Sequence, residues 1–285
     1  MANGITTIVF DLDGTIYQNF SFHKDYFRFL LEDTGKEAWY GSLVGFSQDV
    51  FAGRRLVMNA FYRNDAVRAD TPEEYFHLLG GALAPEAHTQ GFPPREKYTY
   101  LGDAWALVTF VGLTLGLLEG ERRNLIYKKT RDKMESDGMR GDARLRDAII
   151  RAGKRYETVL LSNSYEATAR AFLGQLGFEG VFDRQSFSAD KPYGLVEALG
   201  KLSPCALAHP ETVLAVGDHA FNDLAPLRAL GCRTLWVNPY EGINEPPHDE
   251  SVKTLNELTA YLNALCARWS GPDIKTYKKQ QEADK

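Results

Sequence analysis

Short apolar runs that end abruptly at polar residues alternate with amphipathic helical patterns along much of this chain. The runs span Thr6–Phe10, Val159–Leu161, Val213–Val216 and Arg233–Val237. Helical periodicity lies between or after them, over residues 143–152, 166–176, 193–201, 221–230 and 254–265. Buried strands that alternate with helices indicate βαβ units and a mainly parallel sheet covered on both faces. We therefore expect a doubly wound, Rossmann-like α/β core.

One long stretch departs from this alternation. Residues 19–140 contain aromatic-rich helical patterns and no convincing strand. These patterns span Phe22–Leu31, Phe46–Tyr62, Pro72–Leu83, Ala104–Leu118 and Arg122–Lys133. The length of the stretch suits a separate domain. The sequence thus predicts a core of residues 1–18 and 141–269, an inserted all-helical domain over 19–140, and a polar, frayed tail over 270–285.

Composition limits the class of protein. The chain has 285 residues, a formal net charge of −5 and 44% hydrophobic residues, as in an ordinary globular enzyme. This charge gives no electrostatic reason to expect nucleic-acid or anionic-membrane partners. Three scattered cysteines fit neither a disulfide framework nor a zinc site. The N-terminus lacks the pattern of a signal peptide, so we expect a cytoplasmic protein. We also expect a monomer or a homodimer.

The most apolar segment is Ala104–Leu118. It is shorter than the roughly 20 residues that a membrane span needs, so we interpret it as a buried helix. The alternative, a membrane-attached protein, predicts dependence on detergent.

Polar residues stand at the end of each candidate strand. In an open parallel sheet, ligands bind beyond the carboxyl ends of the strands, so these side chains should meet at one edge. The candidates are Asp11, Asp13, Ser162, Asn163, Asp218, Asp223 and, just before a helix, Lys191. Four separate segments therefore bring carboxylates, a hydroxyl, an amide and a lysine to one place.

Such a group suits phosphoryl transfer. Crowded carboxylates need a cation among them, and a few oxygen ligands favour Mg²⁺. We expect Asp11 and Asp218 to bind the metal, with Asp223 close by. A carboxylate can also act as a nucleophile, and Asp11 is the candidate. Asp13 would protonate the leaving alcohol and then deprotonate the attacking water.

The remaining polar residues would hold the phosphoryl group. Lys191 would balance its charge, while Ser162, Asn163 and nearby backbone N–H groups would contact its oxygens. Each residue also has an ordinary structural interpretation. Ser162 and Asp223 are suited to cap helices, Lys191 precedes a helix-starting proline, and Asn163 only flanks the motif.

These segments carry a family resemblance. DLDGT at 11–15, the apolar run into Ser162, the DKP lysine at 191 and GDHAFND at 217–223 resemble, in order, the four motifs of the haloacid dehalogenase-like hydrolase superfamily. The resemblance implies that Asp11 is the nucleophile and Asp13 the acid/base. It implies that Ser162 and Lys191 contact phosphate, and that Asp218, Asp223 and the Asp13 carbonyl lie at the metal. The insertion resembles the helical type 1 cap of that superfamily.

The resemblance also narrows the reaction. Members that cleave carbon–halogen or carbon–phosphorus bonds typically lack an aspartate at the position of Asp13. We therefore expect a Mg²⁺-dependent phosphatase that hydrolyses a small phosphomonoester through an aspartyl-phosphate on Asp11. One departure from the family pattern is His219, at a position where a small residue is usual. A phosphomutase using the same carboxylates, and a non-catalytic phosphometabolite-binding module, are the alternatives.

Overall fold

The computed structural model describes residues 4–89, 91–241 and 244–269, and it divides into two compact units. Within the described residues, the first unit comprises 4–18, 139–239 and 247–269. The second comprises residues 19–138 and 240–246. The tail expected over 270–285 lies outside the described residues.

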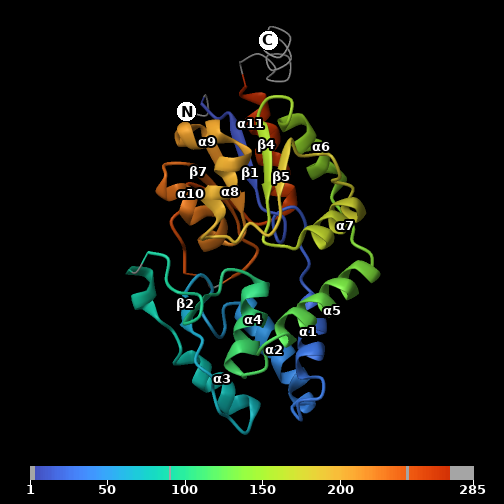
Figure 1. Ribbon diagram of the computed structural model, residues 1–285, viewed down its shortest axis with the longest axis vertical. Helices are drawn as coiled ribbons and strands as arrows, with labels where there is room; N and C mark the ends of the chain where they lie inside the picture. The colour runs from blue at the N-terminus through green and yellow to red at the C-terminus, as the bar shows by residue number, and fades with distance from the viewer. Residues whose placement is uncertain (1–3, 90, 242–243, 270–285) are drawn as a thin grey trace. The chain divides into compact units, whose positions relative to one another are not determined.

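The first unit is built on a six-stranded parallel sheet in the order β5-β4-β1-β6-β7-β8 (Figure 1). Its strands are β1 (Thr7–Phe10), β4 (Glu157–Leu161), β5 (Arg184–Ser186), β6 (Val213–Gly217), β7 (Arg233–Val237) and β8 (Glu250–Val252). All neighbouring strands in it are parallel. The strand order reverses beside β1, which is where ligands bind in folds of this kind.

Helices cover both faces of this sheet. They are α6 (Ala143–Ala152), α7 (Glu166–Leu176), α8 (Leu195–Leu202), α9 (Pro204–Ala208), α10 (Ala225–Ala229) and α11 (Leu255–Ala267). Figure 1 shows α8, α9 and α10 on one side of the sheet, and α6, α7 and α11 on the other. The expected doubly wound α/β core is therefore confirmed.

Local sequence explains how a typical helix of this unit forms. Asp142 precedes α6, and its carboxylate accepts hydrogen bonds from the N–H groups of Arg144 and Leu145. These bonds satisfy donors that have no partner inside the helix. Leu145, Ala148, Ile149 and Ala152 recur at helical spacing, and all four are buried.

The second unit is mainly helical. Its helices are α1 (Phe22–Leu31), the 3₁₀ turn Glu37–Trp39, α2 (Tyr40–Phe51), α3 (Pro72–Gly80), the 3₁₀ turn Pro85–Thr89, α4 (Ala104–Thr114) and α5 (Arg122–Ser136). Aromatic pairs bind them together: Phe22 stacks on Trp105 with ring centroids 4.1 Å apart, and Phe46 stacks on Phe76 at 4.3 Å. Most of α4 is buried, as expected of the apolar segment. None of the helices in the described ranges has the length and hydropathy needed to cross a bilayer.

The insertion is helical, as expected, apart from one short two-stranded sheet. Strand β2 (Phe61–Arg63) pairs antiparallel with β3 (Tyr98–Tyr100), and both lie in the second unit. The helix expected over 46–62 ends at Phe51. Gly53 and Asn59 follow with φ of 69° and 58°, a left-handed conformation that no α-helix can continue through.

The expected boundaries are also corrected. Residues 240–246, which we expected in the core, belong to the second unit, and its large segment ends at 138 rather than 140. The reason is hydrogen bonding. The N–H of Glu241 donates to the carbonyl of Phe51 at 3.1 Å, and that of Asn244 donates to Met58 at 3.0 Å. The ring of Tyr240 stacks on Phe51, and its hydroxyl accepts from the N–H of Ala104.

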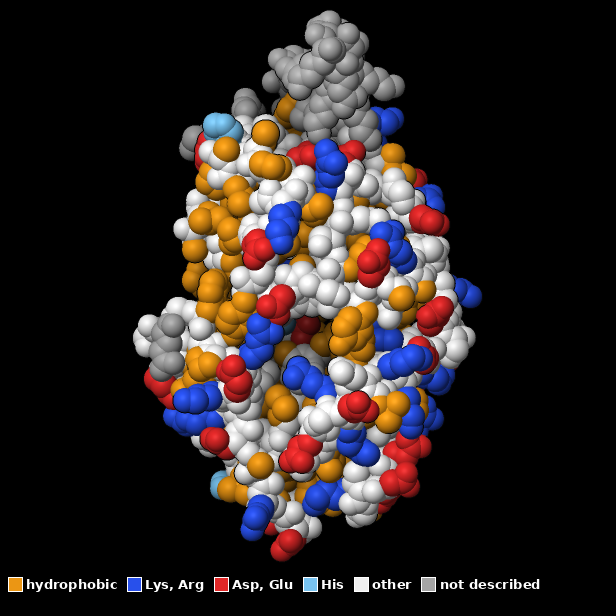
Figure 2. Space-filling model, viewed as in Figure 1, with side chains coloured by type: hydrophobic (Ala, Val, Ile, Leu, Met, Phe, Trp, Pro, Cys, Tyr) orange, Lys and Arg blue, Asp and Glu red, His pale blue; other side chains and the backbone are white. Residues whose placement is uncertain are grey.

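The surface carries charges of both signs. In the face shown in Figure 2, acidic and basic side chains are interspersed over each unit. This distribution agrees with the modest formal net charge of −5.

Candidate active site

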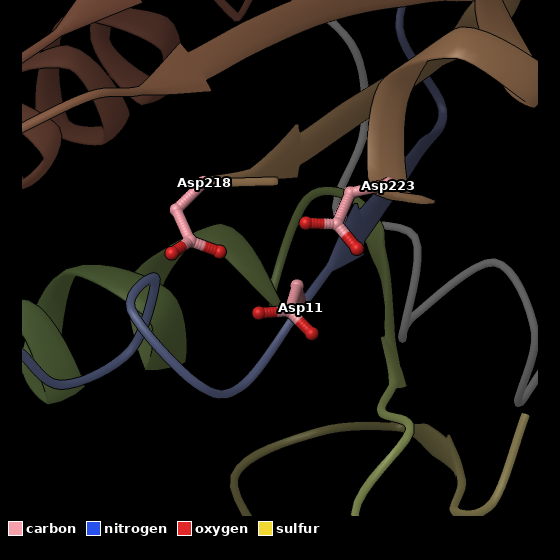
Figure 3. Close-up of side chains that lie close together, drawn as sticks. All are labelled: Asp11, Asp218 and Asp223. Atoms are coloured by element: carbon pink, nitrogen blue, oxygen red, sulfur yellow. The ribbon is translucent and has the colours of Figure 1, made fainter. Parts of the chain in front are cut away.

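Three buried aspartates converge beyond the carboxyl ends of β1 and β6. Asp11 directly follows β1, and its N–H donates to the carbonyl of Val216 at 3.0 Å, so the strand pairing holds it in place. Asp218 directly follows β6, and Asp223 lies in the π-helical turn Ala220–Leu224. Each offers one carboxylate oxygen, and these oxygens lie within 4.8 Å of one another (Figure 3). The expectation that these segments meet at one sheet edge is confirmed for these residues.

A buried lysine joins two of these carboxylates. The Nζ of Lys191 lies 2.5 Å from Oδ1 of Asp11 and 2.6 Å from Oδ1 of Asp223. All three side chains are less than one-tenth exposed. A buried ion pair is costly to break because removal of one partner leaves an uncompensated charge. Lys191 is therefore fixed between the two carboxylates and is not a solvated surface residue.

Electrostatics within this group are strongly coupled. Burial raises the pKa of Asp11 to about 8; Asp223 and Asp13 add to the rise, while Lys191 opposes it. Burial alone would lower the pKa of Lys191, but the carboxylates of Asp11 and Asp223 outweigh it and raise that pKa. Without a further cation, the site thus disfavours a charged Asp11.

Two glycines make the close approach of these carboxylates possible. A Cβ atom on Gly14 would lie 1.9 Å from Oδ2 of Asp218, and Gly14 has a φ of 85°. A Cβ atom on Gly217 would lie 2.4 Å from Cβ of Asp223. Only glycine fits at both positions, since any side chain would occupy the space of a carboxylate.

Asp13 lies two residues after Asp11 and is half-buried. The hydroxyl of Tyr17 donates a hydrogen bond to its Oδ1. The hydroxyl of Ser164 donates to its Oδ2 at 2.6 Å. Both oxygens of this carboxylate are therefore held by hydroxyl groups. Neither Tyr17 nor Ser164 was expected at the site; the serine repeat in Ser162-Asn163-Ser164 is the signal that could have indicated the second.

The segment after β4 serves several contacts. Ser162 is fully buried, and its Oγ accepts a hydrogen bond from the N–H of Ser164 at 3.0 Å. The side-chain amide of Asn163 makes two hydrogen bonds with the backbone of Lys191. Its Oδ1 accepts from the Lys191 N–H at 2.7 Å, and its Nδ2 donates to the Lys191 carbonyl at 3.0 Å. In this structure Asn163 therefore fixes the lysine loop, while its expected contact with phosphate, like that of Ser162, stays a prediction.

The loop after β6 is stabilised by His219 and Trp236. His219 is buried, and its Nδ1 accepts from the N–H of Asn222 at 3.1 Å, which caps the turn that carries Asp223. The N–H of His219 donates to Oδ2 of Asp223 at 3.0 Å. The indole N–H of Trp236, on β7, donates to the carbonyl of Asp218 at 2.8 Å. His219 thus positions a carboxylate rather than standing at the surface.

The donor set suits a hard divalent cation. Three ionised aspartates and one lysine would leave this buried group with a net charge of −2. Carboxylate oxygens in small number are what Mg²⁺ prefers, because it retains waters and accepts a phosphate oxygen as a further ligand. Asp11, Asp218 and Asp223 therefore fit the cation that the sequence led us to expect.

Comparisons with known proteins agree with this fold. A family model described as a haloacid dehalogenase-like hydrolase matches residues 5–231. One similar structure is that of the putative hydrolase YfnB from Bacillus subtilis, which belongs to this type and was crystallised with bound magnesium. Its sequence is 18% identical to this chain and the TM-score is 0.54. The match covers 91% of this chain and 99% of that one. The family protein SP0104 from Streptococcus pneumoniae is 15% identical with a TM-score of 0.50, covering 90% and 98%.

A further similar structure is that of a dehalogenase. The L-2-haloacid dehalogenase RSc1362 is 17% identical with a TM-score of 0.48, and the match covers 92% of this chain and 100% of that one. At such low identities the likenesses to YfnB and SP0104 show the fold alone. A comparison with curated protein sequences found no match.

Proposed function

We propose that this chain, which belongs to the haloacid dehalogenase-like hydrolase family, is a Mg²⁺-dependent phosphatase that acts on a small phosphomonoester. The observation that carries the proposal is the buried cluster of Asp11, Asp218 and Asp223, with the ammonium group of Lys191 between Asp11 and Asp223. Asp13 beside this cluster adds a carboxylate that can move protons. Carbon–halogen cleavage needs no such acid, so its presence favours phosphate esters.

Asp11 is the proposed nucleophile. One of its oxygens attacks phosphorus, the bond to the ester oxygen breaks, and the phosphoryl group passes to Asp11. Asp13 gives its proton to the departing alkoxide. A water molecule then attacks the phosphorus of the aspartyl-phosphate and returns a proton to Asp13. Inorganic phosphate leaves, and the carboxylate of Asp11 is regenerated.

The other residues would stabilise charge. Lys191, fixed by Asn163, would offset negative charge on the nucleophile and on the phosphoryl oxygens. Ser162 and Asn163 would contribute to binding those oxygens. Mg²⁺, held by Asp11, Asp218 and Asp223 with the Asp13 carbonyl, would neutralise the phosphate and orient it for in-line attack.

Phosphate release from a panel of phosphomonoesters tests the proposal. The panel includes an aryl phosphate, sugar phosphates, phosphoglycolate and nucleoside monophosphates, each with Mg²⁺ and with chelator. We expect release that requires the metal and is abolished by Asp11→Asn. Asp142→Asn is the matched control, since asparagine caps a helix as well as aspartate does and α6 should be unaffected.

Two other outcomes would favour the alternative functions. Rapid isomerisation of a sugar phosphate with slow net phosphate release would replace the phosphatase with a phosphomutase. If folded, metal-loaded protein releases phosphate from no member of the panel and isomerises none, the proposed reaction is wrong and the non-catalytic binding module is the alternative that remains.

A further inference from the structure

The carboxylate of Asp13 is held in an unusual way. Tyr17 donates to one of its oxygens and Ser164 donates to the other. The tyrosine comes from the loop that follows β1, and the serine from the segment between β4 and α7. Two independent parts of the chain therefore converge on a side chain to which the proposed function assigns proton transfer.

Each donor is itself held firmly. Tyr17 is 5% exposed, its ring packs edge-on against Phe172 with centroids 5.9 Å apart, and its carbonyl accepts from the N–H of Gly14 at 3.0 Å. Ser164 is also 5% exposed. Its N–H donates to Oγ of Ser162, and its carbonyl accepts from the N–H of Ser188, both at 3.0 Å. The Tyr17 ring and the Ser164 backbone, which carry the two hydroxyls, are therefore held in place by buried contacts.

We infer that Tyr17 and Ser164 are positioning residues that clamp the acid/base Asp13 in its productive orientation. This inference rests on the proposed function. Hydrogen bonds to both oxygens fix both side-chain torsions of Asp13. Proton transfer depends on such placement, because an acid must lie within hydrogen-bond reach of the leaving oxygen.

The clamp has a signature that a purely structural role lacks. An acid helps most when the leaving alkoxide is strongly basic, and least when it departs as a stable anion. Loss of the clamp should therefore slow cleavage of an alkyl phosphate and nearly spare that of an aryl phosphate with an acidic phenol. General destabilisation would slow both substrates alike.

The test uses Tyr17→Phe and Ser164→Ala in the full chain loaded with Mg²⁺. Single-turnover release of the alcohol from glycerol phosphate, and of nitrophenol from nitrophenyl phosphate, isolates the first step. We expect each variant to slow glycerol release about tenfold, the effect of one lost hydrogen bond, and nitrophenol release less than about threefold. KM should change little, and the double variant should approach Asp13→Asn.

Matched controls separate the clamp from ordinary buried hydrogen bonds. Tyr156→Phe removes a buried tyrosine hydroxyl that donates to the carbonyl of Leu265 at 3.0 Å. Ser203→Ala removes a serine hydroxyl that donates to Glu157 at 2.5 Å, at the opposite end of β4. Both should leave the ratio of the two rates unchanged.

The outcomes are distinguishable. If the wild-type enzyme cleaves both esters but Tyr17→Phe and Ser164→Ala slow both equally, or neither, the clamp is wrong and the phosphatase stands. If the wild-type enzyme cleaves neither ester nor any member of the phosphomonoester panel, the proposed function fails and the clamp fails with it. Should one variant not fold, the other still decides, because it contacts a different oxygen of Asp13.

Discussion

His23 should make the helical unit sensitive to acid. It is 2% exposed, and neither ring nitrogen has a hydrogen-bond partner among the described residues. Its ring packs edge-on against Phe27 and Phe51, with centroids 6.5 and 5.5 Å apart. Burial, with a smaller effect of Lys24, lowers the pKa of His23 from 6.5 to about 4. The folded protein therefore keeps this histidine neutral at a pH where the unfolded chain protonates it.

The direction and size of the change in stability with pH follow from the difference between the folded and unfolded pKa values of His23. Because the folded pKa is the lower one, stability is fully present above pH 6.5 and is lost as pH falls towards 4. With these two values, the unfolded state gains up to about 2 kcal/mol at pH 5 and about 3 kcal/mol at pH 4.

Urea unfolding of wild type and His23→Leu at pH 7.5 and pH 5 measures the effect. The wild-type protein should lose more unfolding free energy between these two pH values than the variant does, by about 1–2 kcal/mol. His77→Leu, at an exposed position of α3, controls for loss of a histidine from the same unit. Equal pH dependence in wild type and His23→Leu, to within about 0.5 kcal/mol, would refute this reasoning.

Three further outcomes are expected. Gly14→Ala should destabilise the protein by more than about 1 kcal/mol in urea unfolding and abolish phosphate release, because its Cβ would collide with Asp218 and its φ is 85°. Asn163→Ala should lower kcat about tenfold or more with unchanged metal affinity, because Lys191 loses two backbone hydrogen bonds; phosphate-release kinetics and Mg²⁺ titration check this. In scanning calorimetry, Mg²⁺ should raise the Tm of the wild-type protein and should raise the Tm of Asp218→Asn much less. An equal rise in both proteins would show that Asp218 is not a metal ligand.

The sequence predicted the core of the fold well because its signals are local. Strands such as Val213–Gly217 are short, apolar and buried on both faces, so their type and their polar ends can be recognised without tertiary information. The meeting of Asp11 and Asp218 follows from parallel topology, because each directly follows one of two neighbouring strands. Strands β5 and β8 were missed because each has three residues and little apolar character.

What the sequence did not predict depends on contacts between distant segments. Residues 240–246 join the helical unit through backbone hydrogen bonds to Phe51 and Met58, and backbone groups leave no trace in a sequence pattern. The roles of Tyr17 and Ser164 likewise depend on where their hydroxyls lie. Asn163 was chosen for its place beside Ser162, yet only the structure places its amide against the Lys191 backbone.

The most direct test of the central claim is to locate the phosphoryl group during turnover. Metal-loaded wild-type protein and Asp13→Asn are mixed with an aryl phosphate, quenched in acid, digested and analysed by mass spectrometry. We predict a phosphoryl group on Asp11 at early times, and a larger amount in Asp13→Asn, because the water that clears the intermediate then lacks its base. Phosphate release with no phosphoryl group on Asp11 in either protein, or with one on another residue, would contradict the account.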